Sequence, residues 1–267
     1  MVKLTGVPET MLWTLHNRAT EARRKDTYLV DPEAIRVDEA IDFPYEERFG
    51  KPEDMTVVRA KLVDDAVRPW IASHPDGAVV ELACGLETQF SRVDNGRVRW
   101  WCVDLPEAID VREKLLPPTE RCQHIRSSAF DLAWMDRVDA SHGVMITAQG
   151  LFMYFPEDHT RRLITAIVER WPGVEILFDT IPAWFSRQTV AAGGWRKTRD
   201  YRVPPMPWGI SRSKIEPTLR GWSNRIARVE TKPYLFARGI KRLWVTVGAH
   251  VPLARDMTPV LSHVYTR

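Results

Sequence analysis

Residues 78–106 read AVVELACGLETQFSRVDNGRVRWWCVDLP. An apolar run from Ala78 to Leu82 enters a turn of small residues, an amphipathic segment follows, and a second apolar run ends on Asp104. This order predicts a strand, a tight turn, a helix and a second strand with a carboxylate at its tip. Asp104 follows Gly85 by 19 residues, close to the spacing of about 20 at which an acidic side chain contacts the ribose of an adenosine-type cofactor.

The turn lacks the glycine pattern of dinucleotide-binding proteins, since Gly85 is the only glycine between Gly77 and Gly96. Glu81 and Glu87 flank the turn, and their charges would repel a pyrophosphate. They suit a cationic ligand without phosphate, so S-adenosylmethionine fits this turn better than NAD. The alternative is that the segment is ordinary α/β framework and holds no ligand.

The composition is that of one globular domain. The chain has 267 residues, of which 44% are hydrophobic and 27% charged, enough to build a sizeable core. It shows neither a membrane-spanning run nor a leader segment, so we expect a cytoplasmic location and no membrane partner. The three cysteines, Cys84, Cys102 and Cys122, form no CxxC pair. We therefore expect small core residues and no metal site.

Short apolar runs alternate with helical patterns from residue 76 onward, which predicts an α/β fold with a parallel sheet covered on both faces. The expected strands are 78–83, 98–103, 122–126, 143–149 and 174–180, followed by strands at about 225–232 and 242–248 that include an antiparallel pair. The expected helices are 9–25, 53–73, 86–92, 106–115 and 157–170, and 31–52 should be irregular apart from one short helix. Ligands of such sheets bind at the carboxyl ends of the strands.

Ala183 to Ile215 breaks the alternation with glycines, prolines and interleaved aromatic residues. An irregular insertion of this length is usually functional, so we interpret it as a lid over the substrate. We expect one domain over residues 1–267. Its expected parts are an N-terminal helical cap (1–75), a cofactor-binding core (76–182), a substrate lid (183–217) and closing strands (218–267).

Basic residues gather in the second half of the chain. Between Ala183 and Arg242 there are 14 Lys or Arg residues and three acids. This excess suggests an anionic partner, either a carboxylate substrate or a nucleic acid, although a solvated basic face explains it equally well. The chain has no RNA-binding signature, so we expect no nucleic-acid partner.

Six blocks, taken in order, carry a resemblance to a known family. They are GVPETMLWTLHNRATEARRKD with LVDP, RAKLVDDAVRPWI, VVELACGLETQFSRVDNG, WCVDLPEAIDVREKLLP, SSAFDLAWMD and QGLFMYFPE. Their order and spacing resemble the leucine carboxyl methyltransferase family, in the bacterial branch that includes polyketide O-methyltransferases of secondary metabolism. The resemblance runs from residue 7 to about 180 and continues more weakly to the end. It implies a class I methyltransferase fold, with a Rossmann-like sheet, and methylation of carboxylates with S-adenosyl-L-methionine.

The resemblance also implies roles for individual residues. Arg18 and Arg59 are expected near the methionine carboxylate of the cofactor, Gly85 as a backbone contact and Asp104 on the ribose. Two residues, Asp131 and Leu132, are expected beside the adenine. The remaining cofactor contacts expected in the crevice at the strand ends are Glu81, Ala83, Leu105, Ser128 and Gln149.

Three departures from the family pattern are visible. The family loop reads Leu-Gly-x-Gly-x-Asp-Thr-Arg, and this chain has Ala83 at the first glycine, which should shift the loop slightly. Gln89 stands where the family has an arginine. Gln149 replaces a glutamate near the cofactor amino group, and an uncharged amide at that position predicts weaker cofactor binding.

Carboxylate methylation needs positioning more than acid–base chemistry, because a carboxylate is already ionised at neutral pH. The protein must align the oxygen, methyl carbon and sulfur and exclude water. We expect Tyr154 and one lid arginine, Arg196, Arg199 or Arg202, to place the substrate. The aromatic side chains of the lid indicate a small aromatic or polyketide-like acid as the substrate.

Two other functions remain open. A hydroxyl acceptor would need a base to remove its proton, and no histidine lies convincingly at the strand ends. The changed loop and Gln149 would also fit a catalytically weak cofactor-binding partner subunit. The sequence does not distinguish oligomeric states.

Overall fold

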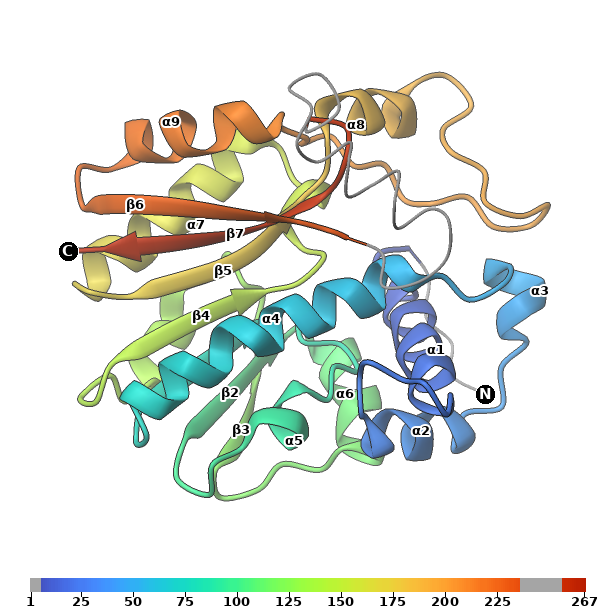
Figure 1. Ribbon diagram of the computed structural model, residues 1–267, viewed down its shortest axis with the longest axis horizontal. Helices are drawn as coiled ribbons and strands as arrows, with labels where there is room; N and C mark the ends of the chain where they lie inside the picture. The colour runs from blue at the N-terminus through green and yellow to red at the C-terminus, as the bar shows by residue number, and fades with distance from the viewer. Residues whose placement is uncertain (1–5, 236–255) are drawn as a thin grey trace.

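The computed structural model describes residues 6–235 and 256–267. Across these residues the strands form one sheet of seven, in the order β3-β2-β1-β4-β5-β7-β6 (Figure 1). The strands are β1 (Ala78–Leu82), β2 (Arg99–Asp104), β3 (Cys122–Arg126), β4 (Val144–Ala148), β5 (Glu175–Thr180), β6 (Ile226–Pro233) and β7 (Val260–Thr266). β1 to β5 pair in parallel, and β7 is antiparallel to both β5 and β6. The predicted α/β class with a mostly parallel sheet is confirmed.

Helices cover both faces of the sheet (Figure 1). The longer ones are α1 (Thr10–Ala22), α4 (Asp54–Ser73), α6 (Pro106–Leu115), α7 (Glu157–Arg170) and α9 (Arg212–Trp222). The shorter ones are α2 (Pro32–Glu39), α3 (Tyr45–Phe49), α5 (Gln89–Val93) and α8 (Ala183–Val190), with 3₁₀ turns η1 (Leu132–Arg137) and η2 (Phe152–Tyr154). Within the described residues, no helix is long and apolar enough to span a membrane.

The core is two-sided because successive residues of a buried strand point to opposite faces. In β1, Val79 packs in a cluster with Val63 and Val67 of α4. Its neighbour Val80 packs in a second cluster that includes Leu163 and Ile167 of α7. All five residues of β1 are buried, as a strand in the middle of a parallel sheet requires.

The expected closing strands are only partly as predicted. β6 covers Ile226–Pro233, close to the expected 225–232. Its antiparallel partner is β7, which the sequence analysis did not identify. The expected strand at 242–248 lies outside the described residues.

The segment expected to be an irregular lid contains two helices. α8 occupies Ala183–Val190, and α9 begins at Arg212 and continues through Pro217 to Trp222. Pro217 removes one backbone hydrogen bond inside α9, but the helix buries Ile215 and Leu219 one turn apart, and this packing outweighs the loss. Only the stretch between the two helices remains irregular.

Residues 31–52 also contain more helix than the one short helix expected. α2 starts after Asp31, whose side chain accepts a hydrogen bond from the Ala34 N–H (2.9 Å). Pro32 sits in the first turn, where a missing N–H costs little. α3 follows at Tyr45–Phe49. The helix expected at 86–92 is shorter, since α5 begins only at Gln89.

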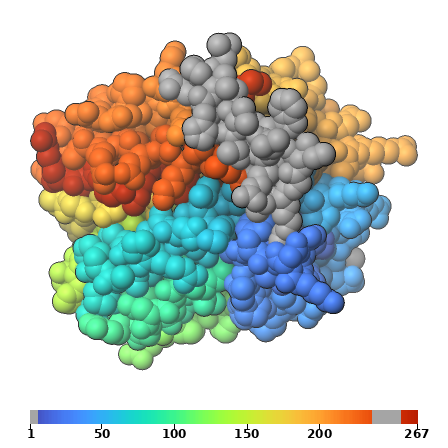
Figure 2. All heavy atoms as spheres, in the orientation of Figure 1, coloured from blue at the N-terminus to red at the C-terminus, as the bar shows by residue number. Residues whose placement is uncertain are grey.

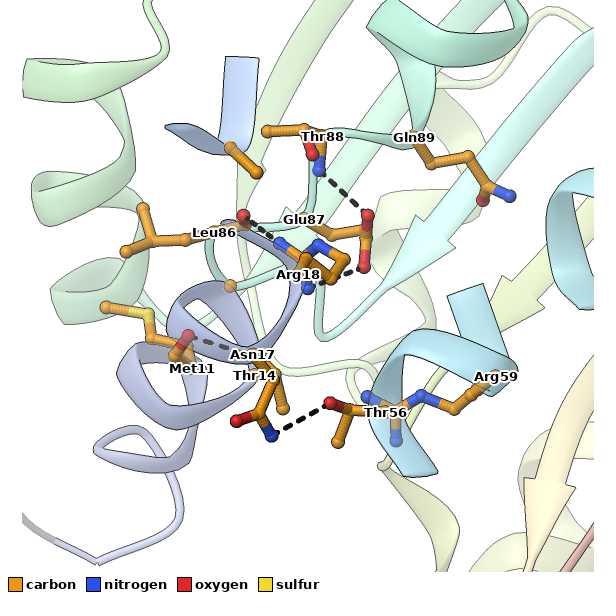
Figure 3. Close-up of polar contacts among 12 residues, drawn as sticks. Met11, Thr14, Asn17, Arg18, Thr56, Arg59, Leu86, Glu87, Thr88 and Gln89 are labelled. Atoms are coloured by element: carbon orange, nitrogen blue, oxygen red, sulfur yellow. Dashed lines mark hydrogen bonds and ion pairs between the residues drawn. The ribbon is translucent and has the colours of Figure 1, made fainter. Parts of the chain in front are cut away.

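The N-terminal helices lie beside the ends of the parallel strands (Figure 1). The space-filling view shows them packed against the core, while the segment that follows α8 projects at the edge of the molecule (Figure 2). Asn17 of α1 donates a hydrogen bond to the Thr56 hydroxyl of α4 (3.0 Å) (Figure 3). These contacts fix α1 over the turn after β1.

A buried ionic network lies behind that turn. The Arg92 guanidinium contacts Asp31 (2.7 Å), Asp64 (2.7 Å) and Glu87 (2.8 Å), and Arg18 contacts the second oxygen of Glu87 (3.0 Å). The side chains of all five are less than a tenth exposed. Such a network stabilises only when every charge keeps its partners, because an unpaired buried charge is costly.

We predict that the free energy of unfolding falls in acid because Glu87 becomes protonated. Burial alone would raise the pKa of Glu87, but Arg18, Arg92 and the Thr88 N–H outweigh it and lower the pKa to about 2. A depressed carboxylate pKa contributes stability above its unfolded value, and this contribution, about 3 kcal/mol, is lost as the pH falls from about 4.5 to 2. Urea unfolding across this range should show the loss. Glu87→Gln should flatten it, whereas the exposed control Glu157→Gln should not; equal profiles for both variants would contradict the assignment.

Candidate active site

The turn after β1 and the tip of β2 are joined by hydrogen bonds. The Asp104 carboxylate accepts one from the Gly85 N–H and one from the Leu105 N–H, both at 2.8 Å. Each carboxylate oxygen keeps a free lone pair that can accept a hydroxyl donor. A Cβ at Gly85 would lie 2.8 Å from the Met11 Cβ, so only glycine fits beneath α1. These bonds hold the Asp104 carboxylate in the cavity wall, and its contact with the ribose stays a prediction.

Ala83 adopts a backbone conformation that favours glycine. Its φ is +53°, and it is the one non-glycine residue with positive φ among the described residues. The loop therefore keeps a left-handed geometry at the position where the family has glycine, and the alanine Cβ is strained there.

Replacing Ala83 should relieve this strain. Ala83→Gly is expected to stabilise the ligand-free protein by roughly 1 kcal/mol, measured by urea unfolding. The control Ala191→Gly, at an exposed site with φ −63°, should lower stability by about 0.5 kcal/mol because glycine gains freedom when unfolded. If both substitutions destabilise equally, Ala83 carries no strain.

Two buried arginines hold the backbone of the turn from behind. Arg18 donates to the Leu86 carbonyl oxygen (2.7 Å) (Figure 3). Arg112 of α6 donates to the carbonyl oxygens of Gly85 (2.9 Å) and Glu87 (2.8 Å). Three consecutive carbonyl groups are thus bound by guanidinium groups, which compensates for the scarcity of glycine in the turn.

A second polar group forms at the ends of β4 and β5. Arg59 of α4 lies 3.3 Å from the Asp179 carboxylate, which also accepts the Gly150 N–H (2.6 Å). Burial disfavours the Arg59 charge, but Asp179 and other neighbours outweigh it and raise the pKa of Arg59. Gln149 precedes this turn, and both polar atoms of its side chain are buried with no hydrogen-bond partner among the described residues. Gln149 lines the cavity described below, so these atoms are available to a ligand bound there.

A cavity of about 580 Å³ connects these groups. It extends from the turn after β1 to a chamber whose wall includes aromatic side chains from three segments. These are Trp13 of α1, Tyr154 and Phe155 after β4, and Trp184, Phe185 and Trp195 of the segment after β5. The volume and the mainly apolar wall with a few polar groups are typical of a small-molecule site.

Comparisons with known proteins agree with this geometry. The family model described as leucine carboxyl methyltransferase matches residues 12–168. The tetracenomycin polyketide synthesis O-methyltransferase TcmP of Streptomyces glaucescens is 31% identical over 219 residues, covering 76% of this chain and 81% of that protein. The chain belongs to the leucine carboxyl methyltransferase family. The predicted family, the cofactor S-adenosyl-L-methionine and the assignment as an S-adenosylmethionine-dependent O-methyltransferase are confirmed.

More distant relatives support the fold. An S-adenosyl-L-methionine-dependent methyltransferase, dpfgK of Gibberella zeae, is 26% identical over 200 residues, covering 67% of each chain. A crystal structure of a methyltransferase from Thermobifida fusca aligns with a TM-score of 0.58 at 14% identity, covering 98% of this chain and 95% of that one. The plantazolicin methyltransferase BamL aligns with a TM-score of 0.54 at 13% identity, covering 97% and 98%. The class I methyltransferase fold predicted from the sequence is confirmed.

The cavity is lined by most of the residues that the sequence predicts to bind the cofactor. They are Arg59, Glu81, Ala83, Gly85, Asp104, Leu105, Ser128 and Gln149. The donor set fits S-adenosylmethionine, since a carboxylate stands at the ribose position and an arginine is available for the methionine carboxylate. One oxygen of Glu81 is also buried without a hydrogen-bond partner among the described residues, and burial raises the pKa of this carboxyl well above its usual value.

Three expected cofactor contacts lie elsewhere in the structure. Arg18 does not line the cavity and is engaged with Leu86 and Glu87 behind the turn. Asp131 and Leu132 are exposed outside the cavity lining, and Asp131 caps the η1 turn by accepting from the Ala133 N–H (3.3 Å). The residues of this segment that reach the cavity wall are Ser128, Ala129 and Phe130.

The lid arginines also differ from the expectation. Arg196 and Arg202 pair across an antiparallel bridge, and both are exposed, as is Arg199. Because side chains alternate along a strand, Trp195 reaches the cavity wall while Arg196 faces away from it. In this structure none of the three arginines lines the cavity. The lid contributes aromatic surface to the site instead of charge.

Lys197 anchors the same segment to the N-terminal helices. Its ammonium forms an ion pair with Glu53 and lies 4.3 Å from the centre of the Trp13 ring. Arg48 of α3 donates to the Asp200 carbonyl oxygen (2.6 Å). These contacts close one side of the chamber between the lid and the cap.

Sequence reasoning missed Asp179 and Tyr234 as site residues. Asp179 lies near the carboxyl end of β5, so the rule that ligands bind at strand ends would have identified it. Tyr234 follows β6 directly and is 4% exposed. Its place on the wall depends on how β6 and β7 are ordered in the sheet, which the local sequence does not reveal.

Gln149 gives a prediction about cofactor affinity. Gln149→Glu should bind S-adenosylmethionine about tenfold more tightly, because a carboxylate makes a charge-assisted contact with the cofactor ammonium. Titration calorimetry measures this directly. The exposed Gln123→Glu adds the same charge away from the cavity and should leave the affinity unchanged. Unchanged or weaker binding by Gln149→Glu would contradict the proposed contact.

Proposed function

We propose that this protein methylates the carboxylate of a small aromatic, polyketide-like acid. The observation that carries the proposal is the continuity of the cavity, which joins the cofactor crevice to a chamber lined by Trp13, Phe185 and Trp195. A planar aromatic body fits between such side chains. The relative TcmP is named as an O-methyltransferase of polyketide synthesis, which supports an acceptor of this class.

The chemistry of the site suits an acceptor that arrives ionised. A carboxylate has an ordinary pKa near 4 and is a nucleophile at neutral pH. When bound, S-adenosylmethionine would supply an electrophilic methyl group on its sulfonium sulfur, which is a good leaving group because it departs as a neutral thioether. The cofactor would be held by residues of the turn after β1, together with Asp104 at the end of β2 and Arg59 of α4. The apolar wall would exclude water and leave the carboxylate poorly solvated, which keeps it reactive.

Tyr154 is the residue best placed to orient the acceptor. It lines the cavity, and burial raises the pKa of Tyr154 to about 12, with Arg59 opposing the shift. The phenol therefore stays protonated at physiological pH and can donate a hydrogen bond to a carboxylate oxygen. A neutral donor positions the carboxylate and leaves its charge in place. A tight ion pair with a guanidinium would neutralise that charge.

A hydroxyl acceptor is the second candidate. It would need a carboxylate or other base to accept its proton, and Asp179 lies in the cavity wall. Asp179 already accepts hydrogen bonds from Gly150 and Arg59, so it is less free to act as a base. We therefore rank the carboxylate acceptor first and a catalytically weak partner subunit last.

The acceptor class can be tested with cofactor labelled in the methyl group. Purified protein is incubated with a panel of aromatic acids and with matched phenols that lack the carboxyl group. We expect label transfer to the acids, released as methanol by mild base because methyl esters hydrolyse readily. Base-stable transfer to the phenols would favour the hydroxyl acceptor, and cofactor binding without transfer would favour the partner subunit.

Tyr154→Phe tests the role of the phenol. We expect kcat/KM for the acid to fall about tenfold to a hundredfold, since one hydrogen bond to a charged group is lost, while cofactor affinity is unchanged. The control Tyr45→Phe removes a buried hydroxyl that has no hydrogen-bond partner in the part of the chain that the structure describes, and Tyr45 lies outside the cavity lining. A Tyr154→Phe enzyme as active as this control would rule out the positioning role.

A further inference from the structure

Two thiols and an imidazole converge between β2 and β3. Cys102 is paired with His124 across the two parallel strands, and Cys122 lies two residues before His124 on the same face of β3. The Sγ atoms of Cys102 and Cys122 are 3.9 Å apart. Together with a ring nitrogen of His124, the three ligand atoms all lie within 4.8 Å of one another. None of the three residues lines the cavity.

The spacing matches that of a thiolate metal site. Two sulfur ligands about 2.3 Å from a tetrahedral Zn²⁺ stand roughly 3.8 Å apart. Cys102 and Cys122 already have this separation and are free thiols. Thiolate and imidazole are the ligands that Zn²⁺ and related thiophilic cations prefer.

Each nitrogen of the buried His124 ring lies beside one charged group. The side chain is 2% exposed, and Nδ1 lies 3.4 Å from Glu113 Oε1 without a hydrogen bond to any described residue. The other nitrogen, Nε2, accepts a hydrogen bond from Arg112 Nε (3.3 Å). β3 is one of the two edge strands of the described sheet, and both cysteines are buried.

Arg112 connects this cluster to the cofactor turn. The guanidinium that contacts His124 also binds the carbonyl oxygens of Gly85 and Glu87. Binding of a divalent cation with loss of two thiol protons leaves the net charge of the cluster unchanged, but a cation bound to His124 Nε2 would displace the hydrogen bond from Arg112 Nε. Arg112 would then lose the contact that helps to orient its guanidinium toward the carbonyl oxygens of Gly85 and Glu87.

We propose that Cys102, Cys122 and His124 form a binding site for a thiophilic divalent cation such as Zn²⁺, and that the cation antagonises the cofactor through Arg112. Binding forms two metal–sulfur bonds and one metal–nitrogen bond, and each thiol releases its proton to solvent. The fourth position is left to water. Because linkage is reciprocal, S-adenosylmethionine must lower the affinity of the protein for the cation by the same factor.

The site is tested with full-length protein freed of metal by a chelator and titrated with Co²⁺ and Zn²⁺. Co²⁺ at one equivalent should give the thiolate charge-transfer absorption of a tetrahedral sulfur site, and Zn²⁺ should displace it. Cys122→Ser should abolish the absorption, as should Cys102→Ser. The control His159→Gln, which removes an exposed histidine on α7, should retain it. Circular dichroism verifies that each variant is folded.

The antagonism is tested by calorimetry of S-adenosylmethionine binding with and without one equivalent of Zn²⁺. We expect the cofactor Kd to rise at least threefold in wild type and in His159→Gln, and to stay unchanged in Cys122→Ser. Absence of thiolate absorption, or equal Co²⁺ binding by folded Cys122→Ser, overturns the site. A cofactor Kd that Zn²⁺ leaves unchanged overturns the antagonism. Neither readout depends on the identity of the methyl acceptor.

Discussion

The turn after β1 needs a positive φ at both Ala83 and Gly85, yet it has a single glycine. The structure meets this constraint with buried guanidinium groups, since Arg18 and Arg112 bind three consecutive carbonyl oxygens of the turn. The Arg18 charge is stable in the interior because Asp31 and Glu87 pair with it. The N-terminal helix that carries Arg18 therefore supports the turn after β1, although Arg18 itself does not line the cavity.

The same network explains one departure from the family loop. Gln89 stands where the family has an arginine, and it donates a hydrogen bond to Asp64 (2.8 Å). Arg92, three residues later on the same face of α5, supplies a guanidinium to Asp64, Asp31 and Glu87. Positions i and i+3 of a helix are neighbours, so the charge is retained after a shift of about one turn.

The acceptor chamber depends on segments that are distant in the sequence. Trp13 belongs to the first helix and Trp195 to the segment after α8, and Lys197 holds the two segments together through Glu53 and the Trp13 ring. Arg196, Arg199 and Arg202 of the lid are exposed. The lid aromatic residues that line the cavity are Trp184, Phe185 and Trp195. The selectivity for an aromatic acid that we propose thus arises from shape and apolar contact more than from ion pairing.

The strand–turn–strand unit from Ala78 to Asp104 was readable because it is local: apolar runs, one glycine and a carboxylate at fixed spacing decide it. Alternation of short strands and helices likewise determined the fold class. The sequence could not show that Arg18 and the lid arginines turn away from the cavity, nor that Asp179 and Tyr234 join it. Nor could it show that Cys102, Cys122 and His124 meet. Those outcomes depend on strand order and on packing between distant segments, which short-range patterns do not encode.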